Sequence, residues 1–195
     1  MIVPIVIDRK NGASMDMWSS FFQHRTLYLS DHILQDVADL LIGQLLFLEK
    51  QNSEEPIMLL INSPGGVVTH ALGIYDCMNY ISCPVSTIVV GQAASAAAVL
   101  LTSGTKGRRG AFPSAEVMFH TVSAAYRGKE ADIEVSAART KHLNEKLMRI
   151  ISKNTGQHID QVKDDLTNDF FLDAEGALDY GAIDFIVENK RQYQG

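Results

Sequence analysis

The sequence predicts an α/β fold, because apolar runs of strand length alternate with segments in which apolar residues recur at helical spacing. Residues 56–61 are a continuous apolar run, which is typical of a strand that is buried on both faces, and residues 85–90 predict another buried strand, which Gly91 closes. Residues 116–119 predict a third strand, and residues 68–80 and 93–102 predict the helices between the strands. We therefore expect an α/β domain in which right-handed crossovers connect the strands.

The N-terminal part of the chain is predicted to contain a loop or hairpin followed by a helix. Residues 8–16 are polar and interrupt a short apolar start. From Asp31 to Lys50, seven apolar residues recur at helical spacing. Either Ser30 or Asp31 is the expected N-cap of this helix, since both side chains can accept a hydrogen bond from a backbone amide of the first turn.

The C-terminal part of the chain is predicted to be mainly helical. A long amphipathic helix is expected over residues 130–153, and Gly156 is expected to end it in the left-handed conformation. Short helices at 158–165 and 174–179 follow, the second with Asp173 as its N-cap. The apolar side of the long helix is expected to carry Ile133, Val135, Leu143, Leu147, Ile150 and Ile151.

Length and composition are those of a globular protein with one core. A chain of 195 residues predicts a single domain over residues 1–195, and 46% apolar residues with 21% charged residues exclude a disordered chain. The net charge of −6 argues against a nucleic-acid partner, because binding to phosphates needs a basic excess. The basic cluster at 106–109 is expected to be a solvated turn. Cys77 and Cys83 fit neither a metal motif nor a disulfide framework, so we expect two reduced structural thiols.

The expected location is the cytoplasm, with an organellar stroma or matrix as the alternative. Residues 1–7 do not have the basic start of a signal peptide, and charged residues follow them at once. The most apolar run, residues 85–101, is too short and too polar in its middle to predict a membrane span. We therefore expect no membrane partner.

Candidate functional residues follow three predicted strands, where the loops of an α/β domain commonly carry function. Residues 62–66 (Asn-Ser-Pro-Gly-Gly) form either a loop whose backbone amides can approach a carbonyl oxygen or a tight turn. Ser95 lies near a helix N-terminus and is either a nucleophile or a small packing residue. His120 is either a base or a structural histidine. No metal-binding spacing occurs among the histidines, so no metal is expected.

Short motifs along nearly the whole chain, taken together and in order, resemble the ClpP peptidase family. They are Ile61–Gly66, Ile74–Asp76, Val85–Ile88, Gly91–Ser95, Pro113, the strand into His120, Ala131–Glu134, Asn154–Gly156, Ala174–Glu175, Asp179–Gly181 and Ile183–Asp184, with Val3–Ile7 similar to the family's axial N-terminal segment.

The resemblance implies a serine peptidase. By position, the nucleophile is Ser95, the general base is His120, and the acid that orients this base is Asp169. The backbone amides of Gly66 and Ala96 would form the oxyanion hole. Peptide substrate would lie against Gly65, Gly66, Val67, Val122 and Ser123.

The resemblance also implies an assembly. The fold would be a crotonase-like spiral with a strand-helix handle at about 121–155 and an axial segment at 1–16. Two heptameric rings of this chain would stack through the handles and receive unfolded proteins from an AAA+ unfoldase of the Clp type. That unfoldase would consume the ATP, so this chain needs no cofactor. The unfoldase would dock at a pocket formed by Met58, Leu60, Tyr80 and Ile88.

The sequence departs from the family's usual pattern around the expected site. Ala96 and Ala97 replace the usual Met and Gly, so residue 97 must adopt a negative φ. Residues 121–126 replace a Gln-Pro and a glycine-rich strand, which changes how a peptide would pair there. Asn168 replaces an Arg that reaches across the ring interface, so the stacked state should be weaker or differently controlled. Met58 and Leu60 stand where the docking pocket is usually aromatic, and the pocket should stay apolar because Met is adaptable.

Two other functions compete with an active peptidase. The first is a ring subunit without activity that supports or regulates an active relative. The altered handle and the pair Ala96-Ala97 favour it, whereas the presence of a complete Ser-His-Asp set argues against it. The second is a crotonase-type acyl-CoA enzyme, which would need no such set and would need a basic pocket for the phosphates of CoA. No such pocket is predicted by the sequence.

Overall fold

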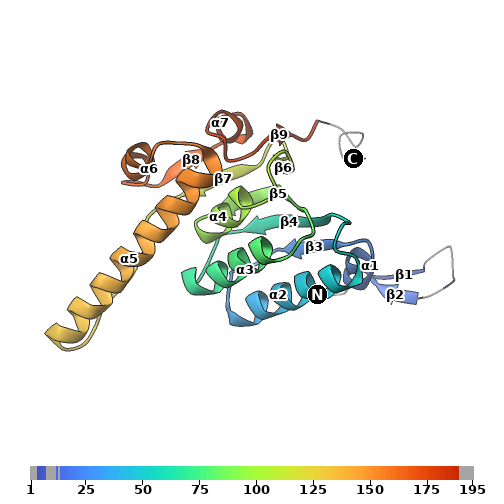
Figure 1. The fold of residues 1–195 in the computed structure, drawn as a ribbon, viewed down its shortest axis with the longest axis horizontal. Coiled ribbons are helices and arrows are strands. Elements are labelled where there is room, and N and C mark those ends of the chain that lie inside the picture. The colour runs from blue at the N-terminus through green and yellow to red at the C-terminus, as the bar shows by residue number, and fades with distance from the viewer. Residues whose placement is uncertain (1–3, 8–11, 13, 189–195) are drawn as a thin grey trace.

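A mostly parallel sheet of seven strands lies at the centre of the structure (Figure 1), a computed structural model that describes residues 4–7, 12 and 14–188. Strands β3, β4, β5, β6 and β9 follow one another across the sheet in parallel, and β7 extends β5 at its carboxyl end before pairing with antiparallel β8. The predicted α/β class is confirmed. The strands are β3 (Thr26–Leu29), β4 (Ile57–Ser63), β5 (Val85–Ala94), β6 (Arg109–Ala111), β7 (Glu116–Phe119), β8 (Phe170–Leu172) and β9 (Phe185–Ile186).

A small hairpin precedes this sheet. β1 (Ile5–Ile7) pairs with antiparallel β2 (Ser14–Asp16), and most of the loop predicted between them lies outside the described residues. Helix α1 (Met17–Gln23) follows directly, and the Asp16 side chain caps it by accepting a hydrogen bond from the Ser19 amide at 2.9 Å. The role of this region as an axial segment stays a prediction.

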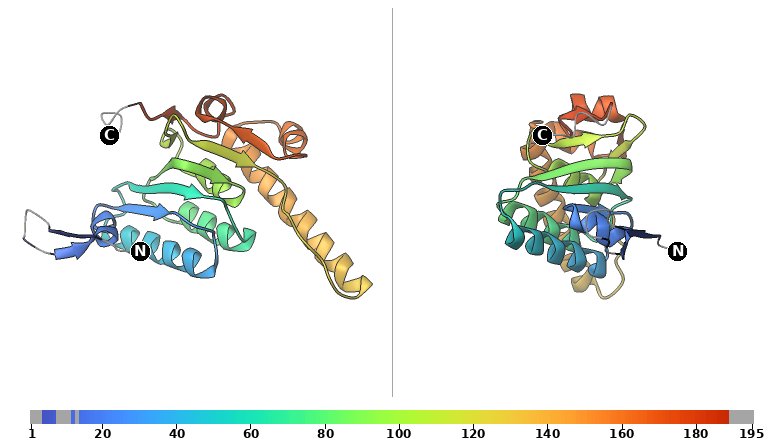
Figure 2. Two further views of the ribbon diagram at one scale, coloured as in Figure 1. Left: turned by 180° about the vertical axis from the view of Figure 1, so that it is seen from behind. Right: turned by 90° about the vertical axis from the view of Figure 1, so that its right-hand side faces the viewer.

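Helices α2 (Gln35–Gln51), α3 (Val68–Tyr80) and α4 (Ala96–Thr102) cover one face of the sheet (Figure 2). The predicted N-cap at Ser30 or Asp31 is wrong, since α2 starts after Leu34. The reason is that Ile33 is held in an extended bridge to the glycine loop. Its amide donates to the Gly65 carbonyl at 2.8 Å, and its carbonyl accepts from the Val67 amide at 3.0 Å.

Strand β5 is longer than predicted, which moves the start of the next helix. The sequence predicts a strand that ends at Val90 and a helix from Ala93, whereas the strand runs to Ala94 and the helix begins at Ala96. The cause is a tertiary pairing, because Gln92–Ala94 form the register with β7. Ser95 therefore occupies the junction between strand and helix rather than the first turn of the helix.

The C-terminal part of the chain consists mainly of α5 (Glu130–Thr155), α6 (Ile159–Asp165) and α7 (Ala174–Asp179). Gly156 ends α5 with a φ of 84°, as predicted. Asp173 caps α7 by accepting from the Gly176 amide at 2.8 Å, also as predicted.

Helix α5 projects away from the sheet (Figures 1 and 2), and only its C-terminal half contributes to the core. Leu147, Ile150 and Ile151 are buried, whereas Val135 is 71% exposed. The prediction of a strand after His120 is wrong, because residues 120–129 form no strand. The segment runs against α5 instead, where the Val122 amide donates to Asn144 Oδ1 at 2.6 Å.

The basic cluster at 106–109 is not a solvated turn throughout, because Arg109 is only 1% exposed. Its Nε and Nη2 donate to the two carboxylate oxygens of Asp184 at 2.9 and 2.6 Å, and Nη1 donates to the Asn154 carbonyl at 2.8 Å. Lys106 adds an ion pair to Asp184 at 3.0 Å. This prediction fails because a turn sequence does not reveal that a carboxylate 75 positions later will pair with one of its cations.

We expect the Asp184 cluster to make stability depend on acid pH. Burial disfavours the Asp184 carboxylate, but hydrogen bonds and charge from Arg109 and Lys106 outweigh it and hold its pKa far below the ordinary value. The stabilisation is therefore complete above about pH 5 and is lost as the pH falls through and below about 4. In thermal unfolding between pH 3 and 7, the stability difference between wild type and Asp184→Asn should narrow on the acid side. A constant difference would contradict this assignment.

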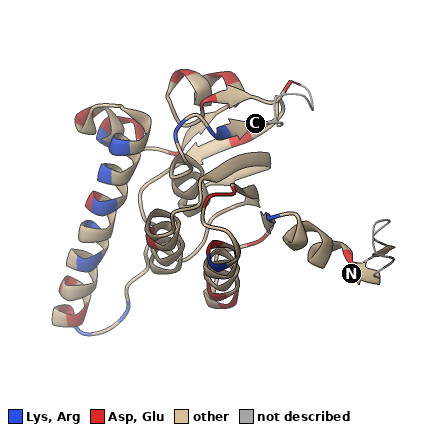
Figure 3. Cartoon of the chain, turned by 45° about the vertical axis from the view of Figure 1, so that its right-hand side comes forward, with Lys and Arg blue, Asp and Glu red and all other residues tan. Residues whose placement is uncertain are grey.

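The described helices contain no segment long and apolar enough to cross a membrane. Figure 3 marks the positions of acidic and basic residues along the backbone, and both signs occur along α5.

Candidate active site

Ser95 is held in an unusual backbone conformation between β5 and α4. Its φ of 57° and ψ of −124° lie in a region that residues other than glycine rarely adopt. Its amide donates to the Met118 carbonyl at 2.7 Å, so the pairing of β5 with β7 fixes the turn. The strained turn exposes the hydroxyl at the carboxyl end of the sheet.

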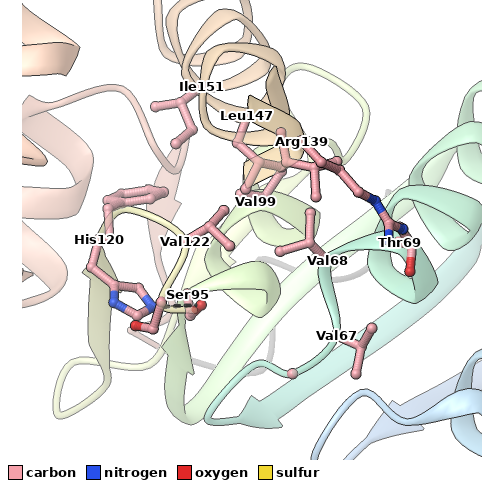
Figure 4. A pocket seen from close by; sticks show the side chains of 14 residues that line it. Val67, Val68, Thr69, Ser95, Val99, His120, Val122, Arg139, Leu147 and Ile151 are labelled. Carbon is pink, nitrogen blue, oxygen red and sulfur yellow. Dashed lines mark hydrogen bonds between the residues drawn. The ribbon is translucent and has the colours of Figure 1, made fainter. Parts of the chain in front are cut away.

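His120 follows β7 directly and meets this hydroxyl. Because Ala94 pairs with Met118, the residues after these two strands lie side by side. Ser95 Oγ lies 2.7 Å from His120 Nε2, which is hydrogen-bond distance (Figure 4). The structure thus brings the first two predicted residues into direct contact.

Asp169 lies on the other side of the imidazole but does not reach hydrogen-bond distance. It precedes β8, and the register of Phe119 with Phe170 places it beside His120. Its Oδ1 is 3.8 Å from His120 Nδ1, an ion-pair separation rather than a hydrogen bond. The Asp169 side chain is 63% exposed and that of His120 23%. Neighbouring Asn168 is exposed too.

Tyr180 supports the two strands that carry His120 and Asp169. Its ring lies 6.2 Å from that of Phe119 and 5.2 Å from that of Phe170, the latter edge to face. Its hydroxyl donates to Asp165 Oδ2 at 2.8 Å. Burial, with this hydrogen bond, raises the pKa of Tyr180 well above its usual value, so the phenol stays protonated. In the sequence, Tyr180 stands out only as part of the motif Asp179–Gly181.

The two glycines after β4 are required by close backbone approach. At Gly65, with a φ of 93°, a Cβ would lie 2.6 Å from the Ala94 carbonyl oxygen and 2.8 Å from Ser95 Cβ. At Gly66, a Cβ would lie 2.6 Å from the backbone of Ile33. Any side chain at either position would displace backbone, so the loop can pack against the serine turn only as Gly-Gly.

The amides of Gly66 and Ala96 are free to bind a ligand. Ile33 forms hydrogen bonds with the carbonyl of Gly65 and with the amide of Val67. The amide of Gly66, which lies between them in the sequence, makes no such bond to Ile33. Ala96 begins α4, where amides have no partner within the helix. Neither amide has an acceptor among the residues that the structure describes. Ala97 lies in the helix without a positive φ, as expected.

A pocket of about 440 Å³ opens beside Ser95 and His120 (Figure 4). Among the predicted substrate-binding residues, Gly66, Val67, Val122 and Ser123 line it, while Gly65 lies behind the serine turn instead. The rest of the lining was not predicted from the sequence, although a spacing of four residues along α5 indicates one wall of the pocket. The missed residues are Val68, Thr69, Val99, Phe119, Arg139, Leu143, Leu147 and Ile151.

The predicted docking residues are only partly brought together. Met58 and Ile88 line a hollow of about 480 Å³ on another part of the surface, and Leu60 pairs with Ile88 in the sheet. Tyr80 lies at the end of α3, is largely exposed, and does not line this hollow. The remaining lining includes the cations Arg25, Lys106 and Arg108. It also includes the carboxylate of Glu55, which lies 3.8 Å from Arg25 Nε.

In the described part of the chain, no three His, Cys, Asp or Glu side chains gather in a way that could hold a metal ion. Both cysteines are free and buried. Burial raises the pKa of the Cys77 and Cys83 thiols, which suits structural rather than reactive residues.

A serine in contact with a histidine, beside an open pocket at the carboxyl end of a parallel sheet, defines the class as a candidate hydrolase. The comparison with protein families agrees with this class. Residues 9–190 match the Clp protease family, described as Clp protease, so the chain belongs to that family. Membership makes it a Clp-type peptidase, from a family that in general assembles into oligomers and works with Clp unfoldases.

Proposed function

We propose that this chain is a serine endopeptidase subunit of a self-compartmentalised Clp protease. It would hydrolyse peptide bonds of unfolded proteins delivered by an ATP-dependent unfoldase, and small peptides unaided. The observation that carries the proposal is the 2.7 Å contact between Ser95 Oγ and His120 Nε2, at a strained turn that opens into a pocket. Such a contact is the starting geometry for nucleophilic catalysis by serine.

The reaction would proceed by acyl transfer. His120 accepts the Ser95 proton while Oγ attacks the scissile carbonyl carbon. The amides of Gly66 and Ala96 donate to the oxyanion that forms. His120 then returns the proton to the leaving amine, which departs with the C-terminal part of the substrate. Water, activated by His120, hydrolyses the acyl-enzyme and regenerates Ser95.

Asp169 would orient the imidazole and stabilise its protonated form. At 3.8 Å the carboxylate attracts the imidazolium through charge but does not fix the tautomer by a hydrogen bond. Its large exposure screens that attraction with water. We therefore assign Asp169 a weaker contribution than His120 in the arrangement described here.

The substrate would lie between the glycine loop and the segment after His120. Gly66 and Val67 form one side of the pocket, and Val122 and Ser123 form the other. The Val122 amide is occupied by Asn144 Oδ1 at 2.6 Å, so a peptide pairing there must displace that side chain. Peptide binding here would therefore differ from the addition of a strand to a sheet edge whose backbone amides are free.

Stacked heptameric rings would enclose these sites. The support is the projecting helix α5, whose outer half presents exposed Ile133 and Val135 that a second ring would cover. An unfoldase of the Clp type would dock at the hollow that contains Met58 and Ile88 and would supply the ATP-dependent step. This chain would use no cofactor.

Labelling with a fluorophosphonate tests the nucleophile. Wild-type protein should gain one adduct per chain in its intact mass, and Ser95→Ala should gain none. Ser53→Ala, in an exposed loop away from the pocket, is the matched serine control and should label like wild type. No adduct on an assembled wild-type ring, with size measured by light scattering, would exclude the proposal and favour a subunit without activity. An equal adduct on Ser95→Ala would also exclude it.

A further inference from the structure

The pocket beside Ser95 has one cation in an otherwise uncharged wall. Of the residues that line it, Arg139 alone carries a fixed charge, since the others are glycine, serine, threonine, apolar residues and His120. Figure 4 shows the Arg139 side chain extending from α5 toward Thr69 on α3. A cation at a binding pocket indicates selection for a negative group unless the protein neutralises it internally.

The spacing along α5 explains why Arg139 belongs to this pocket. Residues four apart lie on the same helix face, and Arg139, Leu143, Leu147 and Ile151 follow one another in such steps. Each step advances about 6 Å along the axis. Leu147 and Ile151 are buried at the inner end, so Arg139 stands at the outer end of an apolar wall.

No carboxylate of the protein neutralises Arg139 in the described structure. Its neighbours at four residues on either side are Val135 and Leu143, so no ion pair forms along the helix. Across the described residues, no Asp or Glu oxygen lies within 4.0 Å of its guanidinium. By contrast, Arg149 on the same helix pairs with Glu145 at 3.7 Å.

The surroundings of the guanidinium offer further donors to an anion. Thr69 contributes a hydroxyl, and the amides of Val68 and Thr69 have no acceptor among the described residues. These amides open α3, whose first turn contains no acidic side chain. The outer end of the pocket is thus polar and positive, while its inner end is apolar.

We propose that Arg139 binds a carboxylate of the peptide substrate and makes this pocket select for peptides that place a carboxylate in it. This inference rests on the proposed peptidase function and names its substrate class. The carboxylate belongs either to an acidic side chain near the scissile bond or to the free C-terminus of a bound peptide. An apolar stem ending in a carboxylate, as in glutamate, matches both ends of the pocket.

The first test compares cleavage of N-acetylated peptide coumarin amides with Glu or Gln at each of the three positions before the scissile bond. At one position at least, wild type should prefer Glu about three- to fivefold in kcat/KM, as expected for a partly exposed ion pair. Arg139→Gln should reduce the ratio of Glu to Gln to about one, and Arg139→Glu should lower it below one, because like charges repel. Lys141→Gln removes the same charge two residues away, outside the pocket lining, and should leave the ratio unchanged.

The second test measures binding without hydrolysis. Fluorescently labelled peptides ending in Glu or Gln, each as free acid or C-terminal amide, are titrated against Ser95→Ala and Ser95→Ala/Arg139→Gln by anisotropy. A preference for Glu that needs Arg139 identifies the side chain, and a preference for the free acid identifies the terminus. Equal affinities and equal cleavage ratios with and without Arg139 would overturn the proposal. Absence of any hydrolysis with Arg139-dependent binding intact would instead refute the peptidase assignment.

Discussion

His120→Ala is expected to lower kcat/KM for a small peptide by at least about 10⁴-fold, because the variant loses the base that takes the Ser95 proton. The basis is the 2.7 Å contact between Ser95 Oγ and His120 Nε2. The residual rate would come from the free amides of Gly66 and Ala96 and from binding in the pocket. Stability should change little, since His120 lies at the surface of the pocket rather than in the core.

Asp169→Asn provides the contrast that makes this prediction specific. It should cost no more than about 10²-fold, because the carboxylate is 3.8 Å from the imidazole and well exposed to water. Steady-state kinetics on assembled protein of equal size would measure both variants. Equal losses from the two substitutions would show that the working enzyme holds Asp169 closer than the described geometry. A loss below tenfold in His120→Ala would refute its role as base.

Arg109→Leu is expected to destabilise the fold by about 3–5 kcal/mol, because it leaves the largely covered Asp184 carboxylate with only the exposed Lys106 as a cation. Arg109 also donates to the carbonyls of Thr102 and Asn154, which end α4 and lie near the end of α5. The substitution thus removes hydrogen bonds to α4, to α5 and to the segment before β9 that contains Asp184. Denaturant unfolding at fixed chain concentration would measure the change, since assembly contributes to apparent stability.

Two further variants separate the ion pair from general disturbance of this turn. Arg108→Leu removes the neighbouring cation, which is not buried, and should cost less than about 1 kcal/mol. Arg109→Leu/Asp184→Leu removes both charges and should cost less than the sum of the two single changes. Additive costs, or equal effects of Arg108→Leu and Arg109→Leu, would contradict the assigned pairing.

Among the described residues, local signals predicted every helix except α1 but only three strands of the central sheet, β4, β5 and β7. They did not predict the short strands β3, β6, β8 and β9, none of which exceeds four residues. Apolar runs located β4 and β7, and the left-handed Gly156 and the capping Asp173 ended and began their helices as expected. These features depend on residues that are close in sequence, so the local sequence pattern predicts them. The start of α2 was not predicted, because the pairing of Ile33 with Gly66 decides it. The length of β5 was not predicted either, because its pairing with β7 decides it.

The candidate site shows the same division. Ser95 and His120 are ambiguous as single residues, and the resemblance to a family supplied their roles together with that of Asp169. The contact between them depends on the register of β5 and β7, which no local pattern reveals. Arg139 escaped notice because its only sequence signal is a position on one face of a helix that was expected to serve assembly.

The sequence by itself determined the α/β class, the positions of most helices and of three strands, and the identity of the candidate triad, because periodicity, capping chemistry and motif order are properties of the chain. Only the tertiary structure decided the strained turn at Ser95, the pairing of Arg109 with Asp184 and the entry of Arg139 into the pocket. Each of these joins residues that are distant in sequence or sets a backbone conformation that neighbouring strands impose. Such geometry is fixed by packing and hydrogen bonding between elements, and these interactions exist only once the chain has folded.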